Sequence, residues 1–239
     1  MTWSVVARDR ETSAFGVSIS TCHLAVGSTC PWLRSGVGAV STQATTNPLY
    51  GAAILDLMAG GVTAADAIES VTSADAGRDH RQVHAIDARG RNGAHTGTRC
   101  FEWCGHLVGD DVSVAGNMLA NERVVAASLD AWNGAAGTPF AERLLAALDA
   151  GQQAGGDKRG RQSAALIVYS SEVYPDIDLR VDDHPDPVAE LLRLYEVAKE
   201  VSLPALDTVP RAGNPAGIYD PDEWEASVAA FKAAEKAKR

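Results

Sequence analysis

The stretch MTWSVVARDRET (residues 1–12) places a short apolar segment almost at the beginning of the sequence. Two hydroxyl residues, Thr2 and Ser4, come before the apolar run VVA, and a charged run at residues 8–11 ends the segment. This pattern predicts a β-strand over residues 2–8. The first residues of most domains are polar and poorly ordered, so a strand in this position suggests a specific structural or chemical use.

Composition indicates an ordinary globular protein that is acidic overall. Of 239 residues, 46% are hydrophobic and 22% are charged. A chain of this length can bury a core without disulfides or metal ions. The 21 basic and 31 acidic side chains give a net charge of -10, and the only basic cluster is the short one at residues 158–161. Nucleic-acid binding is therefore not expected.

Targeting signals are not visible in the sequence. No stretch approaches the roughly 18 apolar residues of a membrane span. Residues 1–12 also do not have the pattern of a signal peptide. We therefore expect a cytoplasmic protein that does not bind membranes, in which the four cysteines stay reduced.

Hydrophobic patterns divide the rest of the sequence into blocks. Further strands are expected at residues 13–21, 36–43, 81–90, 91–100, 110–119, 162–171 and 176–183. Helices are expected at residues 47–61, 63–71, 121–132, 138–153, 185–201 and 223–239. Because strands and helices alternate in blocks rather than as single βα units, the order disfavours a doubly wound parallel sheet. It favours an α+β fold, a four-layer α-β-β-α sandwich of two antiparallel sheets.

A change of composition after Val201 predicts a boundary near residue 203. Residues 1–203 form the expected main domain. Residues 204–239 contain a Pro-rich connector and the last helix, a segment too short to form a second domain alone. We expect this segment to pack on the main domain or on a partner subunit, and a homo-oligomer is the expected assembly.

Thr2 has a specific chemical use at the start of the first strand. Removal of Met1 would give Thr2 a free α-amino group, whose pKa is roughly 7.7–8.0. This amine can accept the proton of the Thr2 hydroxyl, directly or through one water, so that one residue supplies both nucleophile and general base. In the alternative interpretation, Thr2 is an ordinary strand residue that happens to follow Met1.

Six segments together resemble one family. They are WSVVARD (3–9), AVGSTCPW (25–32), GVGAVSTQATTNPLYG (36–51), GNMLA (116–120), GGDKRGRQSAALIV (155–168) and DLRVDDHPDPVAEL (178–191). They are similar to the bacterial family catalogued as domain of unknown function 1028, over residues 2 to about 200. That resemblance implies the fold of the N-terminal-nucleophile (Ntn) hydrolases, a superfamily whose members mostly cleave amide bonds. Cys104 and the pair Cys22-His23 depart from the residues expected in the family, so we expect details of specificity to differ.

Three further residues are candidates near Thr2. Ser4 is a rival nucleophile only if the chain is trimmed further; otherwise its side chain, on the same face of the strand, hydrogen-bonds near the amine. Asn117 is a candidate donor to an oxyanion through its side-chain amide, or else a turn residue. Gln43 ends a strand of small residues where a substrate could approach, or else packs two sheets together.

The segment GDKRGRQSA (156–164) carries charges directly before a buried strand. Arg159 or Arg161 could hold a substrate carboxylate in a bidentate pair. The alternative is a bridge from one of these arginines to Asp182 or Asp183 that fixes the next strand. Gln162 and Ser163 could line the cleft or polarise the amine.

Metal and cofactor chemistry finds little support in the sequence. Cys100, Cys104 and His106 have partial ligand character together with Cys22, His23 and Cys30, but their spacing matches no common zinc module. The sequence also contains no nucleotide-binding loop. We therefore expect no metal and no cofactor. A cysteine- or metal-dependent hydrolase remains the weakest alternative.

The functional hypothesis is an Ntn-type amidohydrolase activated by removal of Met1. Its substrate would be small, such as an N-acyl or N-carbamoyl compound or a cyclic amide. The main alternative is a non-catalytic subunit that keeps the same fold and serves in ligand binding or assembly. Fold-level analogy does not choose between the two.

Overall fold

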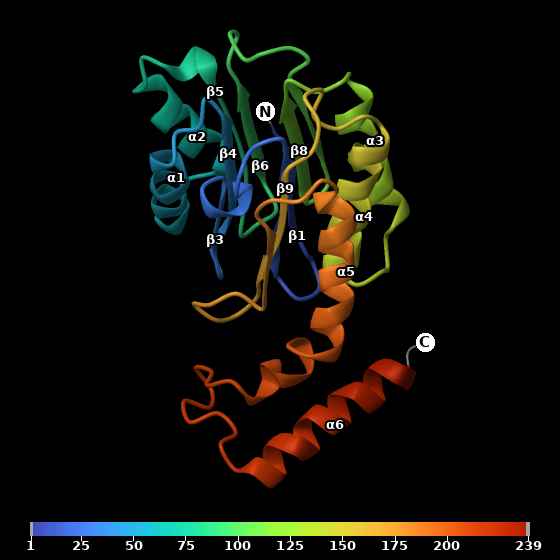
Figure 1. The fold of residues 1–239 in the computed structure, drawn as a ribbon. Coiled ribbons are helices and arrows are strands. Elements are labelled where there is room, and N and C mark those ends of the chain that lie inside the picture. The colour runs from blue at the N-terminus through green and yellow to red at the C-terminus, as the bar shows by residue number, and fades with distance from the viewer. Residues whose placement is uncertain (1, 238–239) are drawn as a thin grey trace. The chain divides into compact units, whose positions relative to one another are not determined.

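The computed structural model describes residues 2–237 of the chain (Figure 1). The chain divides into two compact units, Met1–Leu191 and Leu192–Arg239. The division falls inside helix α5 (Pro187–Glu200), whereas the sequence suggests a boundary near residue 203. Within the described part of the chain, no helix is both long enough and apolar enough to cross a membrane.

The larger sheet of the first unit has six strands, and the strand at the start of the chain lies near its middle. The order of the strands is β10-β9-β2-β1-β8-β7, and every neighbouring pair is antiparallel. Their bounds are β1 Thr2–Arg8, β2 Phe15–Thr21, β7 Gly105–Gly109, β8 Val112–Asn117, β9 Ser163–Tyr169 and β10 Ile177–Val181. β1 is thus paired on both edges, by β2 and by β8, along almost its whole length.

The smaller sheet has four antiparallel strands in the order β3-β4-β5-β6. Their bounds are β3 Pro31–Arg34, β4 Gly38–Ala44, β5 Arg81–Asp87 and β6 Asn92–Thr96. Helices α1 (Leu49–Ala59) and α2 (Ala64–Ser73) cover its outer face. The core on this side joins Val40, Val83 and Ala85 of the sheet to buried residues of both helices.

Helices α3 (Arg123–Gly134) and α4 (Phe140–Gln153) cover the outer face of the six-stranded sheet. The inner faces of the two sheets meet each other, where Val6, Val17 and Ile19 pack with Ala39 and Ile86. The first unit is therefore a four-layer α-β-β-α sandwich of two antiparallel sheets (Figure 1), which confirms the expected α+β fold class.

A local sequence signal accounts for the start of α2. Thr63 caps α2, because its hydroxyl accepts a hydrogen bond from the backbone N–H of Asp66 at 3.1 Å and donates to the Asp66 carboxylate at 2.7 Å. The strands expected at residues 2–8 and 13–21 occur as β1 and β2. The sequence did not indicate β3 or β7, which are short strands at sheet edges.

The second unit contains the remainder of α5, a 3-10 helix η3 (Leu203–Thr208) and α6 (Pro221–Ala237). Two shorter 3-10 helices, η1 (Val26–Ser28) and η2 (Arg78–His80), belong to the first unit. α6 packs against η3. The helix expected at residues 223–239 occurs as α6, although residues 238 and 239 lie outside the described residues. How the segment packs on the main domain or on a partner remains a prediction.

Candidate active site

Thr2 is the first residue of β1 and is almost completely buried. It lies directly opposite Asn117 of β8 in the antiparallel register. On the other side, its hydroxyl donates a hydrogen bond of 3.3 Å to the hydroxyl of Thr21, at the end of β2. Met1 lies outside the described residues, so its removal remains a prediction.

Asn117 ends β8 with its side chain between Thr2 and the opposite sheet. Its Nδ2 atom donates to Oε1 of Gln82 at 2.9 Å and approaches the carbonyl oxygen of Thr2 at 3.4 Å. The second contact is longer than the usual 2.9–3.0 Å of such bonds, so it holds the N–H only weakly. The structure thus brings together two candidates, Thr2 and Asn117, that are 115 positions apart in the sequence.

Ser4 lies on the same face of β1 as Thr2 and points into the interface between the sheets. Its hydroxyl donates to Oε1 of Gln43 at 2.9 Å and lies 2.7 Å from Nε2 of His84. Ser4, Gln43 and His84 are all fully buried. The Ser4 side chain, two residues after the nucleophile candidate, is therefore held in a buried polar network.

Gln43 and Gln82 form the centre of this network. Nε2 of Gln43 donates to Oε1 of Gln82 at 2.8 Å and to the carbonyl oxygen of Ala115 at 3.2 Å. Nε2 of Gln82 lies 2.8 Å from the carbonyl oxygen of Gly116 and 2.9 Å from the hydroxyl of Thr96. Buried amides without partners would destabilise the fold, and here the network satisfies them.

His84 extends the network across the interface to β8. Its Nδ1 atom lies 3.0 Å from the hydroxyl of Ser113. Burial and, after it, the charge of the nearby His106 lower the pKa of His84 to about 3, so the ring is neutral near pH 7. Neither Gln82 nor His84 was a candidate from the sequence, because polar residues that alternate along a strand normally face solvent.

Two strands end at this edge of the sandwich in strained backbone. Ala44 follows Gln43 with φ of 71°, and Met118 follows Asn117 with φ of 54°. Residues with a Cβ rarely adopt this left-handed conformation, which costs on the order of 1 kcal/mol or more. Such strain gathers at functional sites, and both instances here adjoin residues of the polar network.

Arg159 is held by a buried carboxylate in the loop before β9. The side chain of Asp157 is fully buried, and its Oδ2 atom lies 3.0 Å from Nη2 of Arg159. The same carboxylate accepts hydrogen bonds from the backbone N–H groups of Cys22, at 2.8 Å, and of Arg159, at 2.9 Å. Cys22 directly follows Thr21, so this loop is anchored beside the start of β1.

Arg161 and Gln162 have partners at the other side of the same loop. Arg161 forms an ion pair of 2.9 Å with Asp186, and both side chains are partly exposed. The Gln162 side chain donates to Asp183 at 3.2 Å, while its backbone N–H donates to the carbonyl oxygen of Thr21 at 3.0 Å. Of the alternative partners suggested for the arginines, Asp182 pairs instead with Arg180.

Ser163 is fully buried and fixes the loop after β2. Its hydroxyl accepts from the backbone N–H of Val26 at 3.0 Å and donates to the carbonyl oxygen of His23 at 2.5 Å. The candidates therefore fall into two groups. Thr2, Ser4, Gln43 and Asn117 share one polar network, whereas Arg159, Arg161, Gln162 and Ser163 hold the adjoining loops.

The four cysteines are free thiols. Burial raises the pKa of Cys100 to about 11 and also raises the pKa of Cys104, which makes both poor nucleophiles near neutral pH. Across residues 2–237, no group of three or more His, Cys, Asp or Glu side chains is arranged to hold a metal ion.

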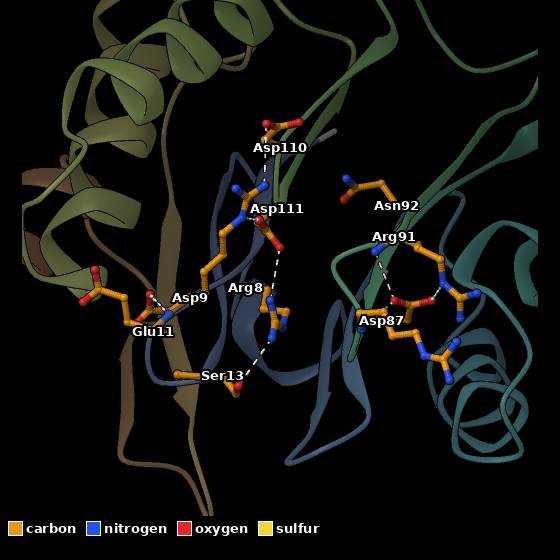
Figure 2. Close-up of polar contacts among 12 residues, drawn as sticks. Arg8, Asp9, Glu11, Ser13, Asp87, Arg91, Asn92, Asp110 and Asp111 are labelled. Carbon is orange, nitrogen blue, oxygen red and sulfur yellow. Dashed lines mark hydrogen bonds and ion pairs between the residues drawn. The ribbon is translucent and has the colours of Figure 1, made fainter.

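The opposite end of β1 carries ion pairs instead of the buried polar network (Figure 2). Arg8 and Arg10 both pair with Asp111, Arg8 at 3.4 Å, and Arg10 also lies 3.5 Å from Asp110. A separate pair joins Arg91 to the buried Asp87 at 2.6 Å. These contacts tie the ends of neighbouring strands and their turns together, so we assign them a structural role.

Comparison with known proteins gives one family. A family model described as "Family of unknown function (DUF1028)" matches residues 2–191. A crystal structure of a Silicibacter pomeroyi protein with the same family description is 33% identical in sequence. The alignment covers 92% of this chain and 96% of that chain, with a TM-score of 0.85.

Two structures of Anbu from Hyphomicrobium sp. strain MC1, one of them a mutant, are more distant. They are 11% and 12% identical to this chain in sequence. The alignments cover 82% and 83% of this chain, and 94% and 96% of the Anbu chains. The TM-scores are 0.40 and 0.41. At this similarity they contribute nothing to the interpretation of the site. No curated protein matches the sequence.

Proposed function

The chain belongs to the DUF1028 family, whose description assigns no activity, and from its site we propose that the protein is an Ntn-type amidohydrolase. One observation carries the proposal. Thr2 begins a strand that is paired on both edges, with its hydroxyl beside Thr21 and the Asn117 amide 3.4 Å from its carbonyl oxygen. A nucleophile placed there is rigidly held and has polar neighbours.

The reaction begins with removal of Met1, which gives Thr2 an α-amine. The amine takes the proton of the Thr2 hydroxyl, directly or through a water, and Oγ1 attacks the substrate carbonyl carbon. The tetrahedral intermediate collapses as the C–N bond breaks, and the amine proton passes to the leaving nitrogen. Water then attacks the acyl-enzyme ester, which releases the carboxylic acid and restores the Thr2 hydroxyl.

Asn117 is the proposed donor to the oxyanion. One of its N–H groups is engaged by Gln82, and among residues 2–237 the other makes only the long contact with the carbonyl oxygen of Thr2. A developing negative charge is a stronger acceptor than a peptide oxygen, so this N–H is available to the transition state. We assign Ser4 a supporting place in the network rather than a reacting one.

A substrate with a carboxylate fits the loop before β9. The ion pair of Arg161 with Asp186 is partly exposed, and such pairs contribute only about 0–1 kcal/mol, so a substrate carboxylate can replace the aspartate. Arg159 and Gln162 border the same loop. Gln43 and Ser163 are fully buried, and we assign them to the walls that shape the site.

The proposal is tested first by the intact mass of the untagged protein. We expect a mass lacking one methionine, together with periodate cleavage at the exposed amino alcohol of Thr2. Wild type should then hydrolyse at least one compound in a panel of N-acyl, N-carbamoyl and cyclic amides. Thr2→Ala should lose at least about 10³-fold in rate, as expected when the only nucleophile is removed.

Ser18→Ala is the matched control for this test. Ser18 is a fully buried hydroxyl of β2 that donates to the carbonyl oxygen of Leu144, on the face turned toward α4. It should keep wild-type activity. Retention of Met1, or equal hydrolysis by wild type and Thr2→Ala, would rule out Thr2 as the nucleophile.

A non-catalytic subunit is the second candidate, and one observation favours it. The Thr2 hydroxyl, both N–H groups of Asn117 and the Ser4 hydroxyl all have partners inside the protein. A site satisfied in this way could bind a ligand without reacting with it. A retained Met1 would make the non-catalytic subunit the leading hypothesis.

Assembly and location complete the proposal. The second unit exposes large apolar side chains, including Val201 and Tyr219, which a second copy of the chain would cover. We therefore propose a homo-oligomer. The four free cysteines suit the reducing cytoplasm, where we place the protein.

A further inference from the structure

The orientation of the Gln82 side chain is fixed by backbone atoms. One end of its amide lies 2.8 Å from the carbonyl oxygen of Gly116 and 3.1 Å from that of Gly105. Carbonyl oxygens only accept hydrogen bonds. The atom that faces them must therefore be the nitrogen Nε2, and the oxygen Oε1 must face the other way.

This orientation decides the orientation of two further amides. Oε1 of Gln82 lies 2.8 Å from the Gln43 side chain and 2.9 Å from the Asn117 side chain. Because Oε1 can only accept, both neighbours must turn their nitrogens toward it. Gln43 agrees independently, since its nitrogen also lies 3.2 Å from the carbonyl oxygen of Ala115 and its oxygen accepts from Ser4.

Asn117 is the last member of this chain of amides. With Nδ2 held by Gln82, its second N–H is directed to the carbonyl oxygen of Thr2 at 3.4 Å. Among the described residues, only this long contact would still oppose a rotation of the amide by half a turn if Gln82 were absent, and that rotation would present the oxygen Oδ1 instead. The N–H at the start of β1 thus depends on a residue of the other sheet.

We propose that Gln82 is a positioning residue that makes Asn117 present an N–H, rather than its oxygen, beside Thr2. The inference rests on the proposed function, in which that N–H stabilises the oxyanion. Gln82 is fully buried in β5, and we assign it no contact with the substrate. It acts only through Asn117, so its loss should resemble the loss of Asn117.

A double-mutant cycle tests this dependence on the amide that the panel identifies as a substrate. Gln82→Met and Asn117→Ala should each lower kcat by about 10–10³-fold, the range for a lost oxyanion donor, with little change in KM. The double variant should be no slower than Asn117→Ala alone. Losses that multiply would show that Gln82 does not act through Asn117 and would overturn the inference.

Ser113→Ala is the matched control. Ser113 is also fully buried in the interface and lies on β8 like Asn117, but its hydroxyl contacts His84. Its removal should leave kcat unchanged, because it costs a buried hydrogen bond without touching the Gln82–Asn117 contact. An equal loss of kcat in Ser113→Ala would mean that any damage to the interface is enough to lower kcat, which would also contradict the inference.

A measurement without substrate separates this inference from the proposed function. Neutron diffraction on deuterium-exchanged wild-type crystals should place two deuterons on the Asn117 atom nearest Gln82. Finding the oxygen there would overturn the inference even if the enzyme is active. If no amide is hydrolysed but the nitrogen faces Gln82, the proposed function fails while the positioning by Gln82 stands.

Discussion

At the scale of single residues, the site is a set of polar side chains in a place where apolar ones are the rule. Burying an amide or an imidazole without partners costs about 1–3 kcal/mol in proteins. Here Gln43, Gln82 and His84 recover that cost through mutual hydrogen bonds. Such an interface requires each group to have one orientation, which makes it sensitive to changes of protonation.

His84 should make stability depend on pH. Ser4 donates its proton to Gln43, so Nε2 of His84 must carry the hydrogen and Nδ1 must accept from Ser113. The folded pKa of about 3 lies below the unfolded value of roughly 6.5. The unfolded state therefore binds more protons between these values, and the free energy of unfolding falls as pH falls from 6.5 toward 3.

This lowering of the His84 pKa corresponds to a loss of at most about 5 kcal/mol in the free energy of unfolding between pH 6.5 and pH 3. His84→Gln keeps a donor and an acceptor but does not titrate, so its stability should depend less on pH over the same range. Urea unfolding at several pH values measures the difference, with the exposed His23→Gln as control. Parallel curves for wild type and His84→Gln would contradict the assignment.

The sequence indicated part of this site for physical reasons. Thr2 and Ser4 stand out because their position at the start of a strand is unusual. Gln82 and His84 do not stand out. They alternate with apolar residues, which is the usual pattern of a strand with one solvent-exposed face. In a four-layer sandwich the second face meets another sheet, and only the tertiary arrangement reveals that the polar residues are buried.

At the scale of elements, long strands with strong patterns were predicted well and short edge strands were not. β1 and β9 are rich in apolar residues and occur where expected. β3 has only four residues and begins with a proline, and β7 begins and ends with glycine. Their pairing comes from neighbouring strands rather than from their own propensity, so a local pattern could not indicate them.

Gly16 sets how closely α4 approaches the six-stranded sheet. A Cβ at this position would lie 2.3 Å from Cδ1 of Leu144 and 2.9 Å from the Phe140 ring. Gly16→Ala should therefore destabilise the protein by about 1–3 kcal/mol, the usual cost of overpacking. Gly134→Ala is the control, since nothing lies within 4 Å of its added Cβ, and it should be neutral or slightly stabilising.

Thermal unfolding of both variants measures the two effects. A Gly16→Ala protein as stable as wild type would mean that α4 can move away from β2 without cost. The close packing of α4 on the sheet would then be looser than the structure indicates.

At the scale of the whole first unit, the interface between the sheets has two different ends. Val6, Phe15 and Ile86 make one part apolar, whereas Ser4, Gln82 and Asn117 make the part nearest Thr2 polar. The apolar part supplies cohesion, because burying apolar area is the main stabilising term in folding. The polar part can then form a functional site without loss of the fold.

The division into two units predicts the result of truncation. Both sheets, helices α1 to α4 and the two core clusters belong to residues before Leu191, while few residues after it are buried. A chain ending at Glu200 should therefore keep a cooperative thermal transition close to that of the full chain. A chain ending at Asp186 also lacks Val188 and Leu191, which are both fully buried.

The free energy of unfolding of the shorter chain should be lower by about 3–6 kcal/mol, the value of burying two such aliphatic side chains. Circular dichroism at increasing temperature compares the three proteins, and the chain ending at Glu200 serves as the reference for the shorter one. If the chain ending at Glu200 lacks a cooperative transition, the residues after Glu200 are part of the folding unit. The connector and α6 would then be needed for the sandwich itself, and the site at Thr2 would depend on them.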